Sequence, residues 1–237
     1  MKVVQFAGWS GTGKTTLIEE VIGAAPPSLV IGVVKHLGGV HPFTLDPGRD
    51  TTRFYERGVR AVVGIDAAKG VTVLRGDTLF AALDRLSDSG CGLALVEGFK
   101  SEPFAKVVIG DLPSDRCVLR NPVAHEVIDA LDRFDDYVSP GGLLRICRER
   151  AGITGAFECS ATLGVAPAFA ADCAALERLE SRCASMPGVV AIGVHGRVYA
   201  GAGTIVLALI ARDSVGGSAA FAELVAGAGG TTGSGGR

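Results

Sequence analysis

The chain lacks several features that mark common classes of protein. Its formal net charge is only -2 over 237 residues, so it has no global basic field to attract nucleic acid or an anionic membrane. No apolar run approaches the roughly 20 residues of a membrane-spanning helix, and the first residues contain no secretory cleavage site. We therefore expect a soluble, cytoplasmic protein that binds neither nucleic acid nor membrane.

The positions of the cysteines and lysines argue against further kinds of site and reaction. The six cysteines form no C-x-x-C pair, which argues against a zinc ribbon or a redox dithiol and favours reduced, mostly buried thiols. The only lysines are Lys2, Lys14, Lys35, Lys69, Lys100 and Lys106. A reaction that needs a lysine amine is therefore excluded from the part of the chain that follows.

Short apolar runs alternate with helix-like stretches through the first half of the chain. The runs cover residues 3–7, 29–34, 61–65, 72–74, 93–96 and 105–109. Continuously apolar strands separated by helices indicate a mainly parallel sheet that is covered on both faces. The sequence thus predicts an α/β P-loop NTPase domain over residues 1–152, with segments of helical character at 124–137 and 141–150.

The remainder of the chain has a different pattern of predicted helices and strands. After the glycine-containing break "AGITGAFE", we expect a helix at 168–184, a hairpin of strands at 189–198 and 204–211, and a helix near 218–225. This pattern predicts a small α+β domain over residues 153–226. Residues 227–237 are rich in glycine and are expected to form a flexible tail.

The stretch from Gly8 to Thr15, GWSGTGKT, matches the P-loop pattern G-x-x-x-x-G-K-[ST]. It follows a predicted strand and opens a predicted helix, which is the context that this motif requires. Lys14 is expected to reach the β- and γ-phosphates, and the Thr15 hydroxyl to bind Mg²⁺. The residues expected to hold the phosphates are Gly11, Thr12, Gly13, Lys14, Thr15 and Thr16.

A carboxylate at the tip of another buried strand would complete such a site. In "GLALVEGFK", Glu97 follows the apolar run 93–96, and Gly98 would allow close approach. Ligands bind at the carboxyl ends of parallel strands. Glu97 is therefore predicted to complete the Mg²⁺ site or to orient the attacking water.

The stretch "VVKHLGGVHPFTLDPGRDTTRFYERG" is the densest polar region beyond a predicted strand. Asp46, Asp50 and Lys100 are predicted to line the edge where a cofactor or partner would sit. A solvated loop in which Asp50 caps the next helix is the alternative. His36 and His41 are only weak evidence for zinc, since no cysteine accompanies them. His125 and His195 are expected to be structural or surface groups, and the place of Trp9 is left open.

The residues do not identify the base. No N-K-x-D motif is present, and "RNPVAHE" at 120–126 lacks the lysine and the aspartate. Guanine and adenine therefore both stay open on the residues alone.

Three motifs in order, "FAGWSGTGKTTLIE", "VVKHLGGVHPFTLDPGRDTTRFYERGV" and "LALVEGFKSEPFAKVVIG", resemble the MobB family of molybdopterin-guanine dinucleotide biosynthesis adapter proteins. The resemblance covers roughly residues 2–111. It implies GTP binding with weak hydrolysis, Mg²⁺, a homodimer, and assistance to the MobA-like nucleotidyltransferase that attaches GMP to molybdopterin. The link "LGGVHPF" is slightly longer than is usual in the family.

Residues 155–226 more weakly resemble MoaE, the large subunit of molybdopterin synthase. The likeness lies in a helix that leads to P-G-V and then a hairpin. His195 is followed by Gly196 where that family has H-R, and the catalytic lysine segment is missing. We expect no synthase reaction from this part of the chain, which would instead serve docking or dimerisation.

Two other functions are compatible with a P-loop. A small-molecule kinase would need a mobile lid with arginines over the phosphates, and Arg49, Arg53, Arg57 and Arg60 are the candidates for it. A metallochaperone-type GTPase would show a Cys/His cluster, and none is compelling. The adapter GTPase is the leading hypothesis, and the absence of an obvious arginine finger predicts slow hydrolysis.

Overall fold

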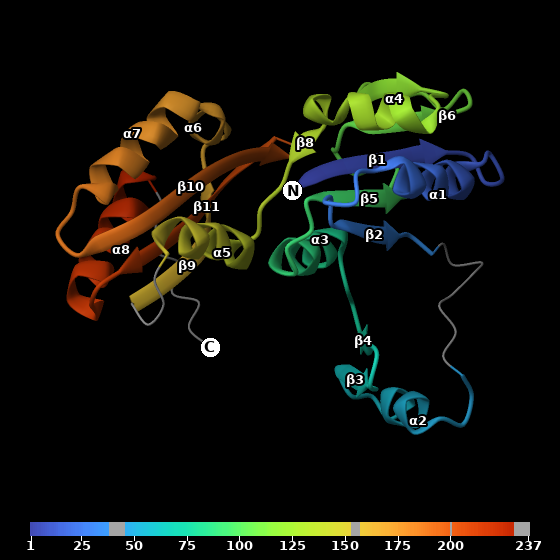
Figure 1. The fold of residues 1–237 in the computed structure, drawn as a ribbon, viewed down its shortest axis with the longest axis horizontal. Coiled ribbons are helices and arrows are strands. Elements are labelled where there is room, and N and C mark those ends of the chain that lie inside the picture. Colours follow the sequence, from blue (N-terminus) through green and yellow to red (C-terminus); the bar gives the residue numbers. More distant parts are fainter. Residues whose placement is uncertain (38–45, 153–156, 200, 230–237) are drawn as a thin grey trace.

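A computed structural model of the chain describes residues 1–37, 46–152, 157–199 and 201–229. Two sheets with their helices lie beside each other, and a small arm extends away from the first (Figure 1). The first sheet comes from the N-terminal part of the chain and is mainly parallel, whereas the second is antiparallel. The predicted fold class is therefore confirmed.

Five strands of the first sheet run parallel in the order β2-β5-β1-β6-β7. The short strand β8 pairs antiparallel with the start of β1. Because the five strands share one direction, their carboxyl ends meet at one edge, where ligands bind in such sheets. The bounds are β1 Lys2–Gly8, β2 Ile31–Lys35, β5 Leu93–Glu97, β6 Lys106–Ile109, β7 Cys117–Arg120 and β8 Asp135–Asp136.

Helices cover both faces of this sheet, which explains its continuously apolar strands. Val4 and Phe6 of β1 are buried on the face that α1 and α4 cover. Val3, their neighbour in the strand, is buried on the opposite face under α3, as the two-residue period of a strand requires. The bounds are α1 Lys14–Ala24, α3 Leu79–Asp88, α4 Ala124–Asp129 and the 3-10 turn η1 Leu131–Arg133.

Two runs that we expected among the strands of the sheet lie outside it. β3 (Ala61–Ile65) and β4 (Gly70–Leu74) form an antiparallel hairpin. With α2 (Asp50–Glu56) they make the arm, residues 46–78, which stands apart from the first sheet (Figure 1). The expectation was wrong because the link at 66–69 is too short for the crossover that parallel neighbours need.

The second sheet has the order β10-β11-β9 and is antiparallel throughout. The predicted hairpin and the final helix are present, but β9 was not predicted. The helix expected at 168–184 is divided at Asp172, whose side chain accepts a hydrogen bond from Ala175 N at 2.9 Å and caps α7. The bounds are β9 Phe157–Val165, β10 Val189–Tyr199, β11 Ala202–Ala211, α5 Pro140–Ala151, α6 Pro167–Ala171, α7 Cys173–Ala184 and α8 Ser214–Gly227.

The central strand β11 forms the core of this second layer. Every residue from Ile205 to Ala211 is completely buried. Val206, Ala208 and Ile210 pack against α5 on one face. Ile205, Leu207 and Leu209 pack on the other face, against α7 and α8. The second sheet is thus held between helices by a hydrophobic core of its own.

Polar contacts join the two layers, where α3 packs against the start of α5. The hydroxyl of the buried Tyr137 donates a hydrogen bond to Asp84 Oδ1 at 2.7 Å. The Arg197 guanidinium lies 4.6 Å from the centre of the Tyr137 ring. Helix α5 packs with the second sheet, although the sequence analysis grouped it with the first. Where the chain divides into independently folding units stays a prediction.

Two other expectations concern cysteines and membranes. All six cysteines are free; Cys147 and Cys183 are buried, three are half-buried, and Cys173 is exposed. None of the helices within the described ranges offers the length of apolar sequence that a bilayer span requires.

Candidate functional site

The loop between β1 and α1 adopts a backbone that only glycine accepts easily. Gly11 and Gly13 have φ angles of 76° and 88°, in the left-handed region that glycine enters without steric cost. Gly13 immediately precedes α1. Backbone N–H groups at such a helix start, together with the positive end of the helix dipole, suit the binding of a phosphate.

The side chain of Lys14 folds over this loop and contacts its backbone. Its Nζ donates a hydrogen bond to Trp9 O at 2.6 Å, and the Thr12 hydroxyl donates to the same oxygen at 2.9 Å. Burial lowers the pKa of the Lys14 ammonium; Glu97 opposes this effect, whereas Lys100 and Lys35 add to it. Mutually repelling ammonium groups that converge in this way favour a polyanionic ligand.

Thr15 and Glu97 meet across the strand tips. The Thr15 hydroxyl lies 3.1 Å from both carboxylate oxygens of Glu97. Lys35 Nζ lies 3.1 Å from Glu97 Oε2 and 3.3 Å from Thr15 Oγ1. A hydroxyl and a carboxylate are hard oxygen donors that suit Mg²⁺, and Lys35 already presents a cation to both. The residues therefore fit the metal, with Thr15 and Glu97 as the groups that would hold it.

The turn after Glu97 is strained and is fixed from β1. Gly98 has φ 93°, and Phe99 has φ 51°, which is unusual for a bulky residue. The side-chain amide of the completely buried Gln5 donates to Gly98 O at 2.8 Å and also to Phe99 O. The ring of Phe99 lies 4.5 Å from that of His36, centre to centre. These contacts fix the position of Glu97 at its strand tip.

A cavity of about 790 Å³ lies over these groups. Of the predicted site residues, Gly11, Thr12, Gly13, Lys14, Thr15, Thr16, Glu97 and Lys100 all line it. Lys35, His36 and Leu37 extend it along the tip of β2. Asp46 and Asp50 do not line it, because both lie on the arm. The structure thus brings eight of the ten predicted residues together, and the binding roles of all ten stay predictions.

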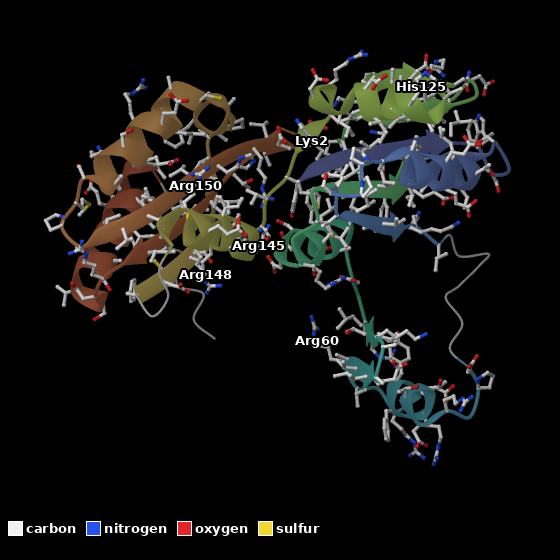
Figure 2. The ribbon with its side chains drawn as sticks, viewed as in Figure 1. Lys2, Arg60, His125, Arg145, Arg148 and Arg150 are labelled. Atoms are coloured by element: carbon white, nitrogen blue, oxygen red, sulfur yellow. The ribbon has the colours of Figure 1, made fainter. Side chains whose placement is uncertain are left out.

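Other candidates from the sequence lie elsewhere. Asp50 does not cap α2: Arg49 occupies the cap position, and Asp50 is the first helical residue. None of the four arginines considered for a lid lines the cavity, and Figure 2 shows Arg60 on the arm. His41 lies outside the described residues. Among those described, no three His, Cys, Asp or Glu side chains gather as a metal site.

The two remaining histidines also lie away from the cavity. His125 is exposed on α4 (Figure 2). His195 lies on β10, where its Nε2 is buried without a hydrogen-bond partner.

Sequence reasoning missed Gln5 and left Trp9 unplaced. Gln5 is a lone polar residue in the apolar run Val3–Ala7, and that position was the available signal. Trp9 is 53% exposed, and its Nε1 donates to Asp111 Oδ1 at 3.1 Å. No sequence signal links these two residues, because the contact depends on β6 lying beside β1.

Comparison with known proteins gives one consistent family. The family model described as "Molybdopterin guanine dinucleotide synthesis protein B", MobB, matches residues 3–123. A probable molybdopterin-guanine dinucleotide biosynthesis adapter protein of Bacillus subtilis is 37% identical over 111 residues, which are 45% of this chain and 64% of that protein. The corresponding adapter protein of Escherichia coli is 31% identical over 135 residues, covering 52% and 75% of the two chains.

Solved structures of similar proteins cover a comparable share. Bacillus subtilis MobB has a TM-score of 0.41 and 26% identity over 59% of this chain and 77% of its own. A MobB homologue from Bacillus stearothermophilus has a TM-score of 0.36 and 24% identity over 58% and 74%.

Proposed function

Because the chain belongs to the MobB family, we propose that it is a GTP-binding adapter of molybdenum cofactor biosynthesis. It would assist a MobA-like nucleotidyltransferase in attaching GMP to molybdopterin. The observation that carries the proposal is the convergence of the P-loop, the Thr15–Glu97 pair and three lysines on one cavity. The likeness to MoaE and the cytoplasmic location stay predictions.

The groups that line the cavity would each contact a different part of Mg²⁺-GTP. The backbone N–H groups around Gly11 and Gly13 would bind phosphate oxygens, and Lys14 would neutralise the β- and γ-phosphates. Thr15 and Glu97 would hold Mg²⁺, which would draw charge away from the γ-phosphate. Glu97 would also be placed to orient water.

Hydrolysis is expected to be slow. No arginine is among the described residues that line the cavity, and an arginine finger supplies several orders of magnitude to related GTPases. A persistent GTP complex suits an adapter, which needs the nucleotide as a binding state and not as a source of rapid turnover.

The arm supports the proposal of a homodimer. Its exposed apolar side chains include Phe54 at 57%, Val63 at 59%, Ile65 at 82% and Val71 at 47% exposure. Val63 and Ile65 lie on one face of the hairpin and Val71, opposite Gly64, on the other; exposed apolar groups on a protruding arm are a common mark of a protein interface. We propose that the arms of two copies cover each other, and sedimentation of the full chain measures the stoichiometry.

The test is a calorimetric titration of the full chain with Mg²⁺-GTP and Mg²⁺-ATP. GTP should bind more tightly than ATP, and Lys14→Ala should abolish binding of both while the protein stays folded. Lys69→Ala, an exposed lysine of the arm, is the matched control and should bind GTP normally.

A capture experiment tests the partner. A purified molybdopterin nucleotidyltransferase should be retained by the wild-type chain in the presence of GTP and lost with Lys14→Ala. Normal GTP affinity in Lys14→Ala would refute the site. An ATP preference with a phosphorylated small product would replace the adapter by a kinase, and a stoichiometric bound transition metal would point to a metallochaperone.

A further inference from the structure

We propose that Trp9 and Asp111 form a subsite for the 2-amino-4-oxopyrimidine ring that guanine and the pterins share. The inference rests on the proposed function, because it extends the phosphate site toward the ring that accompanies the phosphates. It assigns ring recognition to two residues that no sequence motif marks.

The position of the subsite follows from the strand order. Thr15, Glu97 and Lys35 gather on the β5 and β2 side of the P-loop. A triphosphate whose metal-binding end lies there has the opposite side of β1 open for its base, over the tips of β6 and β7. Asp111 follows β6 by two residues and is exposed at that edge.

The tip of β6 is packed tightly against the P-loop. A Cβ added to Gly8 would lie only 2.6 Å from Ile109 O, so the two backbones touch. A Cβ on Gly110 would lie 3.9 Å from Thr12 Cγ2. Asp111 is therefore placed beside the phosphate loop and is not part of a distant surface.

The loop that carries Asp111 is held rigidly on both sides of that residue. Asn121 Oδ1 accepts a hydrogen bond from Gly110 N at 2.6 Å. Arg120 donates to Gly110 O at 2.7 Å and to Leu112 O at 3.3 Å. Asn121 itself has φ 48°, a left-handed conformation that asparagine adopts more readily than most residues. The contacts fix the backbone while they leave the Asp111 carboxylate at the surface.

Trp9 lies next to this carboxylate, beside the residues Gly8 and Ser10 that line the phosphate cavity. Its Nε1 donates to Asp111 Oδ1 at 3.1 Å, and Lys100 Nζ lies 4.5 Å from the centre of its ring. Yet 53% of Trp9 is exposed, an unusual cost for so large an apolar surface. Within the described chain, Asp111 Oδ2 has no donor. A flat ring stacked on Trp9 could bring one N–H group to that oxygen and a second to Oδ1, which has a further lone pair beside the Trp9 bond.

The chemistry of the ring selects its identity. Guanine and pterins present a ring N–H beside an exocyclic amino group, which are two donors for one carboxylate. Adenine presents an unprotonated ring nitrogen at the corresponding edge, and its lone pair would face the carboxylate. The subsite therefore favours the 2-amino-4-oxopyrimidine ring and disfavours adenine.

Trp9 is the only tryptophan of the chain, and its carbonyl oxygen accepts from Lys14, so its fluorescence reports on both the phosphate site and this subsite. Titration of the full chain with GTP should change the emission of Trp9, and Asp111→Asn should weaken GTP binding by about 10- to 100-fold. The same variant should improve binding of xanthosine triphosphate, whose 2-oxo group accepts a hydrogen bond from the Asn amide. Asp115→Asn, an exposed residue nearby on the chain, is the matched control and should leave GTP affinity unchanged.

Tripolyphosphate separates this inference from the proposed function. It should bind the wild type and Asp111→Asn with equal affinity, because it has no ring for the subsite to hold. If tripolyphosphate does not bind at all, the phosphate site itself is wrong. If it binds but Asp111→Asn alters neither GTP nor xanthosine triphosphate affinity, the phosphate site stands and the subsite does not bind guanine.

A titration with 6-hydroxymethylpterin distinguishes the two sources of the ring. Weakened GTP binding in Asp111→Asn assigns the subsite to guanine. A Trp9 response to the pterin that Asp111→Asn weakens, with GTP affinity unchanged, assigns it to the pterin. If Asp111→Asn changes the binding of neither ring, the inference is overturned.

Discussion

The two sheets differ in where their polar and apolar side chains lie. In the first, the strands end in groups that face a cavity or its rim: the P-loop after β1, Lys35 on β2 and Glu97 on β5. In the second, the central strand is completely buried from Ile205 to Ala211, and its residues contact the covering helices. The first sheet concentrates charge at one edge, whereas the second concentrates packing at its centre.

Backbone strain follows the same division. Phe99 and Asn121 are the two non-glycine residues with positive φ in the described parts of the chain. Both follow strands of the first sheet, near Glu97 and near Asp111. The conformation is strained in the bulky Phe99, as is common at functional sites, whereas asparagine adopts it more readily. We conclude that a ligand should stabilise the first sheet, and that the stability of the second depends mainly on its packing.

The largest expected effect tests whether the two cores are separate. Leu207 is completely buried against α7 and α8, so Leu207→Ala should lower the free energy of unfolding by about 2–5 kcal/mol. In calorimetry we expect two transitions, of which GTP raises only one and Leu207→Ala lowers only the other. Leu95→Ala, an equally buried residue of β5, is the control and should lower the transition that GTP raises. A single transition affected by all three changes would overturn the division.

Much of the first sheet could be predicted because its signals are local. Gly11 through Thr16 lie in one continuous motif, and Glu97 ends a continuous apolar run, so the shared edge of parallel strands suffices to bring them together. Contacts that depend on strand order could not be predicted. The pairing of Trp9 with Asp111 and of Gln5 with the 98–99 turn requires knowledge of which strands are neighbours.

Some errors had signals that were present but weak. In β9, Phe157, Cys159, Ala161, Leu163 and Val165 alternate with the period of a strand, but small residues and the glycines before them conceal it. The arm was misassigned because its apolar runs read as buried strands, although the short link between them permits only a hairpin. Nothing in the sequence indicated that Asp46 and Asp50 would lie on the arm and not among the residues that line the cavity.

A smaller effect tests the strain at the site. Gly98→Ala would put a Cβ 2.8 Å from His36 Cβ at a φ of 93°, so we expect a loss of about 1–3 kcal/mol in stability together with weaker GTP binding. Gly58→Ala is a close match, since its φ is 91° and no atom lies within 4 Å of the added Cβ. Chemical unfolding and GTP titration of both variants measure the two effects. Equal GTP affinities in the two would mean that the turn does not position Glu97.

The smallest effect concerns the second sheet, which contains a partly buried titratable group, His195, away from the cavity. Burial lowers the pKa of His195; Asp136 opposes this effect, whereas Arg197 and the N-terminus add to it. Above about pH 6.5, the value for an unfolded histidine, neither state binds the proton. Below it the unfolded chain takes up a proton that the folded chain resists, so stability should fall by at most about 1.4 kcal/mol per pH unit. His195→Gln should reduce this loss in urea unfolding between pH 7 and 5, whereas His125→Gln, on the exposed surface of α4, should not. GTP affinity should be the same in both variants, because neither histidine lies among the residues that line the cavity. A change in GTP affinity with His195→Gln would mean that the second sheet influences the site beside the P-loop.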